Sequence, residues 1–230
     1  MKHVLEVCLI ALTLNAPITL AQSESTPTLR PGISVQMVVS GSASPMPAAD
    51  NEDALVVTVT DGGAVYFGIT PLAPAALAEQ VKDLLSNREQ RLYIKADART
   101  PYANVVKVLE AARSTGVKAP VLLTTQSEPT APGTITAPRG LEVFVGAATS
   151  GSQSIVVQLS SGQSGPSLTI NRQAVAWDGL ATALRKALQT TAERAVSVKA
   201  DGALPFADVA RVIDACESAR AKATLITPEL

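Results

Sequence analysis

The pattern of hydrophobic and polar positions in the first half of the chain predicts short strands alternating with two helices. Runs of alternating or continuous aliphatic residues predict strands at 34–39, 54–60, 64–67, 92–95 and 121–124. The turn at 61–63 joins two of these strands and predicts a β-hairpin. Apolar residues at helical spacing predict amphipathic helices at 74–86 and 101–113.

The second half of the chain shows the same pattern again. Strands are predicted at 141–145, 154–159, 167–171, 196–199 and 223–227. Helices are predicted at 177–190 and 205–219. The order β, β, β, α, β, α, β therefore occurs twice.

Direct repetition of sequence supports this duplication. Residues 95–113 (KADARTPYANVVKVLEAAR) and 199–217 (KADGALPFADVARVIDACE) match without a gap at a spacing of 104 residues, with eight of nineteen positions identical. A repeat of about 100 residues is too long for a solenoid unit and fits a duplicated small domain.

The predicted fold class is α+β, with two tandem copies of a small βββαβαβ two-layer domain whose helices pack on one face of a mixed sheet. We place the first domain at 33–125 and the second at 141–230. Residues 126–140 contain three prolines and predict a linker, and residues 22–32 predict a polar tether.

The ends of the repeated helices carry local signals. Thr100 is a candidate N-cap and Pro101 fits the first turn, where a missing N–H costs nothing. Gly116 is a candidate left-handed cap after the first helix. The second repeat has Arg220 at the place of Gly116, so its helix is expected to end differently.

The first 21 residues have a positive start, an apolar run and small residues before Gln22, which is typical of a secretory signal peptide cleaved after Ala21. The competing interpretation is a short membrane anchor, although Asn15 and Pro17 interrupt the run. Either interpretation places the rest of the chain outside the cytoplasm. Glu6 is a candidate membrane carboxylate, but it lies near the edge of the apolar run.

Composition excludes several functions. A net charge of −1 gives no electrostatic surface for nucleic acid. The single histidine is His3 and the two cysteines are Cys8 and Cys216, so we expect no cofactor and no metal site. No Ser-His-Asp, Cys-His or phosphate-binding glycine motif is present, so no catalytic residue is assigned and the protein is expected not to be an enzyme. An enzyme that uses a pair of carboxylates is an alternative that nothing in the sequence favours.

The candidate site residues are those that the repeat retains. Asp97 and Asp201 follow short strands and precede the helices; each either contacts a partner or accepts backbone N–H groups in its turn. Tyr102 and Phe206 exchange a hydroxyl for a hydrogen, which favours a packed ring over a proton donor. Pro101 and Pro205 begin the helices.

Residues 91–125 (RLYIKADARTPYANVVKVLEAARSTGVKAPVLLTT), the hairpin at 56–68 and the helix at 74–86 resemble the periplasmic domain of the ExbD/TolR family. The resemblance covers 33–125 well and 141–228 more weakly. Asp97, Pro101, Tyr102, Asp201, Pro205 and Phe206 match the family signature as fold markers. The family's membrane-embedded proton-handling Asp has no counterpart, since Glu6 lies at the wrong end of a shorter segment.

The resemblance implies a periplasmic protein, or one on the periplasmic face of the inner membrane, that is accessory to proton-motive-force-coupled transport or envelope integrity. Implied partners are an ExbB/TolQ-like channel subunit, a TonB/TolA-like protein, peptidoglycan or a second copy. The alternative is a stand-alone module that binds peptidoglycan or another envelope protein. Partners are expected to add to an edge strand at 35–39 or 141–145.

Overall fold

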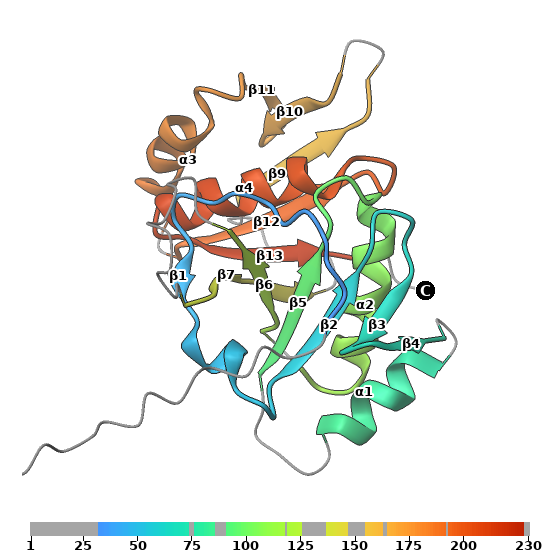
Figure 1. The fold of residues 1–230 in the computed structure, drawn as a ribbon. Helices are drawn as coiled ribbons and strands as arrows, with labels where there is room; N and C mark the ends of the chain where they lie inside the picture. The colour runs from blue at the N-terminus through green and yellow to red at the C-terminus, as the bar shows by residue number, and fades with distance from the viewer. Residues whose placement is uncertain are drawn as a thin grey trace, which may run out of the picture.

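The computed structural model describes residues 32–73, 76–85, 91–117, 119–125, 137–146, 155–162, 165–191 and 193–227, which form two mixed sheets with helices packed against them (Figure 1). The first sheet has the order β1-β7-β6-β5-β2-β3-β4. Its strands are β1 (Ser44–Pro45), β2 (Leu55–Val59), β3 (Val65–Phe67), β4 (Thr70–Leu72), β5 (Leu92–Ala96), β6 (Val121–Thr124) and β7 (Arg139–Glu142). The helices packed against it are α1 (Leu77–Leu85) and α2 (Tyr102–Ser114), and a short 3-10 helix, η1, covers Pro47–Asp50.

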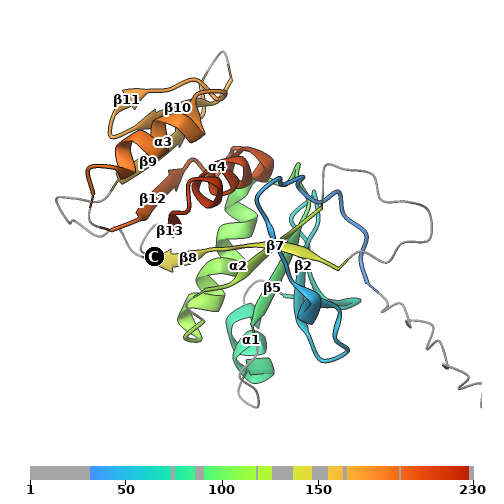
Figure 2. The same cartoon turned by 90° about the vertical axis from the view of Figure 1, so that its left-hand side faces the viewer.

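The second sheet has the order β11-β10-β9-β12-β13-β8. Its strands are β8 (Phe144–Gly146), β9 (Ile155–Ser160), β10 (Ser167–Ile170), β11 (Gln173–Ala174), β12 (Ala195–Ala200) and β13 (Lys222–Ile226). Helices α3 (Leu180–Leu188) and α4 (Phe206–Ser218) pack against this sheet (Figure 2).

The two sheets share one topology. In each, a central strand pairs in parallel with the strand that precedes the long helix and antiparallel with the returning strand of a hairpin. The α+β class is confirmed, and the βββαβαβ order occurs twice, as β2-β3-β4-α1-β5-α2-β6 and as β9-β10-β11-α3-β12-α4-β13. The first three strands of each set are not the predicted three, because the predicted first strand is missing from each set and a short strand follows the hairpin instead. The third strand of each unit is the short β4 or β11, which the sequence pattern did not reveal.

The strand predicted at 34–39 is not formed. This segment instead crosses the carboxyl ends of β5 and β6: Ala98 N–H donates to the Gln36 carbonyl at 2.8 Å, and Val39 makes an isolated parallel bridge to Thr125. The prediction was wrong because β7 pairs with β6 along 121–124 and occupies the edge that a strand at 34–39 would have used.

The strand predicted at 141–145 is divided between the two sheets. Its first part belongs to β7, antiparallel to β6, and its second part belongs to β8, parallel to β13. Val143 lies between them, fully buried, and its N–H donates to the Pro120 carbonyl at 3.1 Å. Residues 139–146, which we call the ribbon, thus form one extended segment that contributes a strand to each sheet (Figure 2). The docking edge expected at 141–145 is corrected accordingly: β7 lies between β6 and β1, so of the two parts of this segment β8 alone stands at a sheet edge.

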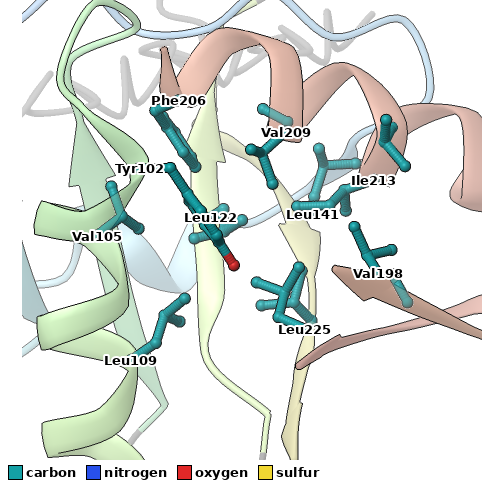
Figure 3. Packing of buried hydrophobic residues seen from close by; sticks show 14 of the residues in the cluster. Tyr102, Val105, Leu109, Leu122, Leu141, Val198, Phe206, Val209, Ile213 and Leu225 are labelled. Atoms are coloured by element: carbon teal, nitrogen blue, oxygen red, sulfur yellow. The ribbon is translucent and has the colours of Figure 1, made fainter. Parts of the chain in front are cut away.

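The buried side chains of the two repeats form one contiguous cluster. Aliphatic residues from α2, α4, both sheets and the ribbon meet around Tyr102 and Phe206 (Figure 3). A smaller cluster on the other face of the first sheet includes Tyr93 and Val121, against which Met37 and Met46 pack. The helices therefore cover one face of the first sheet, and the segment that leads into β2 covers part of the other.

Both long helices end in the same way, which corrects the expectation for Arg220. Gly116 has φ 92° and Arg220 has φ 55°, so both adopt the left-handed conformation. The N–H of the next residue donates back to Ala112 in the first helix and to Cys216 in the second, at 3.1 and 2.9 Å. The helix terminus is thus set by this pair of backbone hydrogen bonds, and Arg220 bears a strain that glycine avoids.

Candidate functional site

The turns that carry the repeated signature meet each other in the structure. Pro101 and Pro205 form an antiparallel bridge between the two repeats. We call the two turns, 98–103 and 202–207, the seam. The seam thereby brings together four of the six signature residues, Pro101, Tyr102, Pro205 and Phe206, while Asp97 and Asp201 directly precede its two turns.

Four backbone hydrogen bonds cross the seam. Tyr102 N–H donates to the Leu204 carbonyl at 2.8 Å, and Phe206 N–H donates to the Thr100 carbonyl at 2.9 Å. Ala103 N–H donates to the Gly202 carbonyl and Ala207 N–H to the Ala98 carbonyl, both at 2.9 Å. These donors belong to the first turns of α2 and α4, which have no intrahelical acceptors. Each repeat therefore caps the helix of the other.

This arrangement explains why Thr100 does not act as the predicted cap. Its side chain is fully buried and makes no capping bond to the helix; its hydroxyl instead accepts a hydrogen bond from the Asn104 amide at 3.3 Å. Carbonyl groups of the opposite repeat have taken the role that a side-chain oxygen usually has. Pro101 and Pro205 directly precede the two helices, as the sequence suggested, and both are exposed.

Tyr102 and Phe206 lie beside the seam in the shared core, with exposed fractions of 2% and 1% (Figure 3). The two rings come from opposite repeats and pack among aliphatic side chains, which include Leu122, Leu141 and Leu225. The Tyr102 hydroxyl has no hydrogen-bond partner in the described part of the chain. Burial raises the pKa of this hydroxyl, because the phenolate would be charged in an apolar environment.

Asp97 is the only buried charged residue in the described part of the chain. Its carboxylate accepts two hydrogen bonds from the Arg99 guanidinium at 2.9 Å and two from the backbone N–H groups of Arg99 and Gln36 at 3.0 Å. The Arg99 side chain lies 3.6 Å from Asp61 as well. The hydrogen bonds from Arg99 hold the pKa of Asp97 well below its usual range.

Asp201 occupies the equivalent turn but has a different environment. It is exposed, and its carboxylate accepts a hydrogen bond from the Ser161 N–H at 2.7 Å. The residue equivalent to Arg99 is Ala203, so no guanidinium is available. The two signature aspartates therefore share a position in the fold without sharing their partners.

Sequence reasoning missed a second contact between the repeats. Asp214 on α4 accepts hydrogen bonds from the Ser40 hydroxyl and from the Ser42 N–H, the latter at 2.9 Å. The Arg139 guanidinium donates to the Ala43 carbonyl, with an Nε to O distance of 2.8 Å. The segment before β2 is thus fixed to both repeats. Its serines carry no repeated pattern, so no sequence signal marked them.

The described residues offer little reactive chemistry. They contain no group of three or more His, Cys, Asp or Glu side chains placed to hold a metal ion. Cys216 is buried, and burial raises the pKa of its thiol to about 12. Glu6 and the predicted N-terminal segment lie outside the described residues. None of the helices in the described ranges is long and apolar enough to cross a membrane.

The fold and the seam define the chain as a tandem α+β module whose two copies close on each other through their signature turns. The family model described as biopolymer transport protein ExbD/TolR matches residues 6–127 and again residues 130–229. The chain therefore belongs to the ExbD/TolR family, and the resemblance seen in the sequence is confirmed over both repeats. A search of curated proteins found no match.

Proposed function

We propose that this protein is a non-enzymatic cell-envelope component, accessory to transport or envelope integrity driven by the proton motive force, that acts through protein contacts made outside the cytoplasm. The family match in both repeats carries this proposal. ExbD/TolR proteins belong to biopolymer transport and are associated with the inner membrane of the cell envelope. The implied partners are an ExbB/TolQ-like channel subunit or a TonB/TolA-like protein.

The state of the buried carboxylate supports a contact role over proton handling for the described part of the chain. A group that carries protons must change its charge near the working pH. Asp97 is held ionised by Arg99, since its pKa lies well below the usual range for a carboxyl group. It therefore stays charged at neutral pH and serves to fix the turn and the segment at Gln36.

We propose that partners bind away from the seam. The backbone donors of the seam are already used between the repeats, so they offer little to an external chain. The two-residue turns between β3 and β4 and between β10 and β11 join the outermost two strands at one edge of each sheet. Ile69 in the first of these turns is 61% exposed, and Arg172 takes the equivalent place in the second.

The experiment is site-specific photo-crosslinking in the native host. A photoreactive residue replaces Ile69 in one strain and Arg172 in a matched strain, which samples both repeats. We expect capture of an ExbB/TolQ-like or TonB/TolA-like protein, and we expect the yield to change when an uncoupler collapses the proton motive force.

Two results would count against the proposal. One is a crosslinking pattern that the uncoupler leaves unchanged at both positions. The other is sedimentation of the chain with purified sacculi without any captured protein, which is the behaviour of a stand-alone peptidoglycan-binding module.

A further inference from the structure

We propose that the seam pairs the two repeats of one chain to the exclusion of a second copy, and that Gly202 permits the close approach of the two turns on one side of the seam. One chain then takes the place of a homodimer. This inference concerns the chain alone and does not depend on the proposed function.

The contacts across the seam have the exchange symmetry of a two-fold dimer. Tyr102 donates to Leu204, and Phe206 donates to Thr100, so donor and acceptor exchange when each residue is shifted by the repeat spacing. The bonds from Ala103 to Gly202 and from Ala207 to Ala98 exchange in the same way. Such a self-complementary surface is the kind that joins two identical subunits in a closed dimer. Both copies of the surface in this chain are already occupied by each other.

The two sides of the seam are not equivalent in space. A Cβ atom added at Gly202 would lie 3.0 Å from the Cβ of Ala103 and 3.6 Å from its Cα. In the first repeat, the position equivalent to Gly202 is Ala98, which faces Ala207. The turns therefore approach each other more closely at Gly202, and an alanine there would force Ala103 to shift by a few tenths of an ångström.

Contacts outside the seam also join the repeats of one chain. The ribbon at 139–146 contributes a strand to each sheet. Ser42 N–H donates to Asp214 of the second repeat at 2.9 Å. A second chain would have to displace these contacts while competing with a tethered repeat whose effective concentration is on the order of millimolar.

Cysteine pairs test the pairing in the full-length chain, with Cys8 and Cys216 replaced by Ala. Pro101 and Pro205 face each other as an antiparallel bridge, for which the Cα atoms are about 4.5–5.5 Å apart. This separation lies within the window of about 4.4–6.8 Å that a disulfide requires. We expect the double variant P101C/P205C to form a disulfide within one chain and to run as a monomer on a non-reducing gel.

The single variant P101C discriminates between the two arrangements, because pairing of first repeats from two chains would place Cys at 101 opposite its own copy. We expect no disulfide-linked dimer from P101C or from P205C, and a monomer mass by light scattering for the parent chain. A P101C dimer, a dimeric parent chain, or a double variant that forms no intrachain disulfide would overturn the inference.

The role of Gly202 is tested by hydrogen exchange at the amides of Tyr102, Ala103, Phe206 and Ala207. We expect G202A to accelerate exchange at these amides by about tenfold or more, because the added methyl group separates the turns, while exchange in β5 and β12 stays unchanged. The matched control A98G, on the other side of the seam, is expected to change exchange much less. Equal effects of the two variants, or none from G202A, would remove Gly202 from the argument.

Discussion

Replacement of Tyr102 by Phe is expected to stabilise the protein. The Tyr102 ring is 2% exposed, and its hydroxyl is buried without a hydrogen-bond partner. An unpaired buried hydroxyl costs about 1–3 kcal/mol relative to water. Some dispersion contact of the oxygen is lost with it, so we expect a net gain of about 1 kcal/mol in the free energy of unfolding. For a chain of this length, that gain corresponds to a rise in Tm of roughly 2–4 °C.

The assay is urea and thermal unfolding at pH 7, followed by circular dichroism. Phe206→Tyr is the matched control, because Phe206 lies beside Tyr102 in the same apolar surroundings (Figure 3). It adds the hydroxyl that Tyr102→Phe removes, and it is expected to lower the free energy of unfolding by about 1–3 kcal/mol.

Alkaline pH provides a second measurement on the same residue. Burial raises the pKa of Tyr102 above the unfolded value of about 10. The contribution of Tyr102 to the free energy of unfolding is therefore constant below pH 10. It falls as the pH rises further, because the unfolded state releases the proton while the folded state retains it. Tyr102→Phe lacks this loss, so its advantage over the parent is expected to grow above pH 10.

The reasoning would be refuted if Tyr102→Phe destabilised the protein by about 1 kcal/mol or more. Such a result would mean that the hydroxyl makes a favourable hydrogen bond in the folded protein. A neutral Phe206→Tyr would contradict it equally, since the surroundings would then accommodate a hydroxyl at no cost.

Three further predictions follow from other residues. Arg220→Gly should raise the free energy of unfolding by about 1 kcal/mol, because φ 55° strains any residue with a Cβ, while Gly116→Arg should lower it; urea unfolding measures both. Asp97→Asn should lower the urea midpoint at pH 7 and should make this midpoint fall less steeply as the pH is lowered. The reason is that the depressed pKa of Asp97 stabilises the parent chain above pH 4, and this contribution disappears as the pH falls. The Cys216 thiol should react with a disulfide reagent at pH 8 only after unfolding, with Cys216→Ala as the blank.

Each of these predictions has a contradicting result. A destabilised Arg220→Gly would show that the arginine side chain contributes more than its backbone strain costs. Acid unfolding curves that coincide for the parent chain and Asp97→Asn would remove the ion pair with Arg99 from the stability argument. Rapid modification of Cys216 in native protein would mean that α4 opens readily.

Local patterns were sufficient to predict much of the fold. The hairpin of β2 and β3 and the four helices follow from periodicity and turn residues within short windows. Strands β4 and β11 were missed because they have three and two residues, and β4 contains Pro71. Such short strands are defined by their pairing with a neighbour, which no local pattern reports.

The division at Val143 was equally inaccessible from sequence. The run at 141–145 is aliphatic enough for one strand, and its pattern is the same whichever sheet each part joins. Pairing with β6 on one side and β13 on the other is decided by tertiary contacts. The predicted division of the chain into two domains at 33–125 and 141–230 therefore stays a prediction.

The candidate site was found in part. The repeat identified Asp97 and Tyr102, because the second copy keeps an aspartate at 201 and an aromatic ring at 206. It did not reveal that the two turns meet, because a constant spacing of 104 residues between two segments does not tell whether they lie close together in space. Arg99 and Gly202 escaped notice for the opposite reason: each differs between the copies, and the difference is what gives Asp97 its partner and the seam its close approach.

The ribbon formed by β7 and β8 also limits where the chain could be divided into two. If the gene were split upstream of Arg139, the N-terminal product would keep β6 but lose the strand that pairs with it. If it were split after Glu142, β7 would remain at a free chain end, severed from the strand that anchors the other product. Either breakpoint removes strand pairing that residues 139–146 provide, so we expect the separated halves to be less stable than the intact chain.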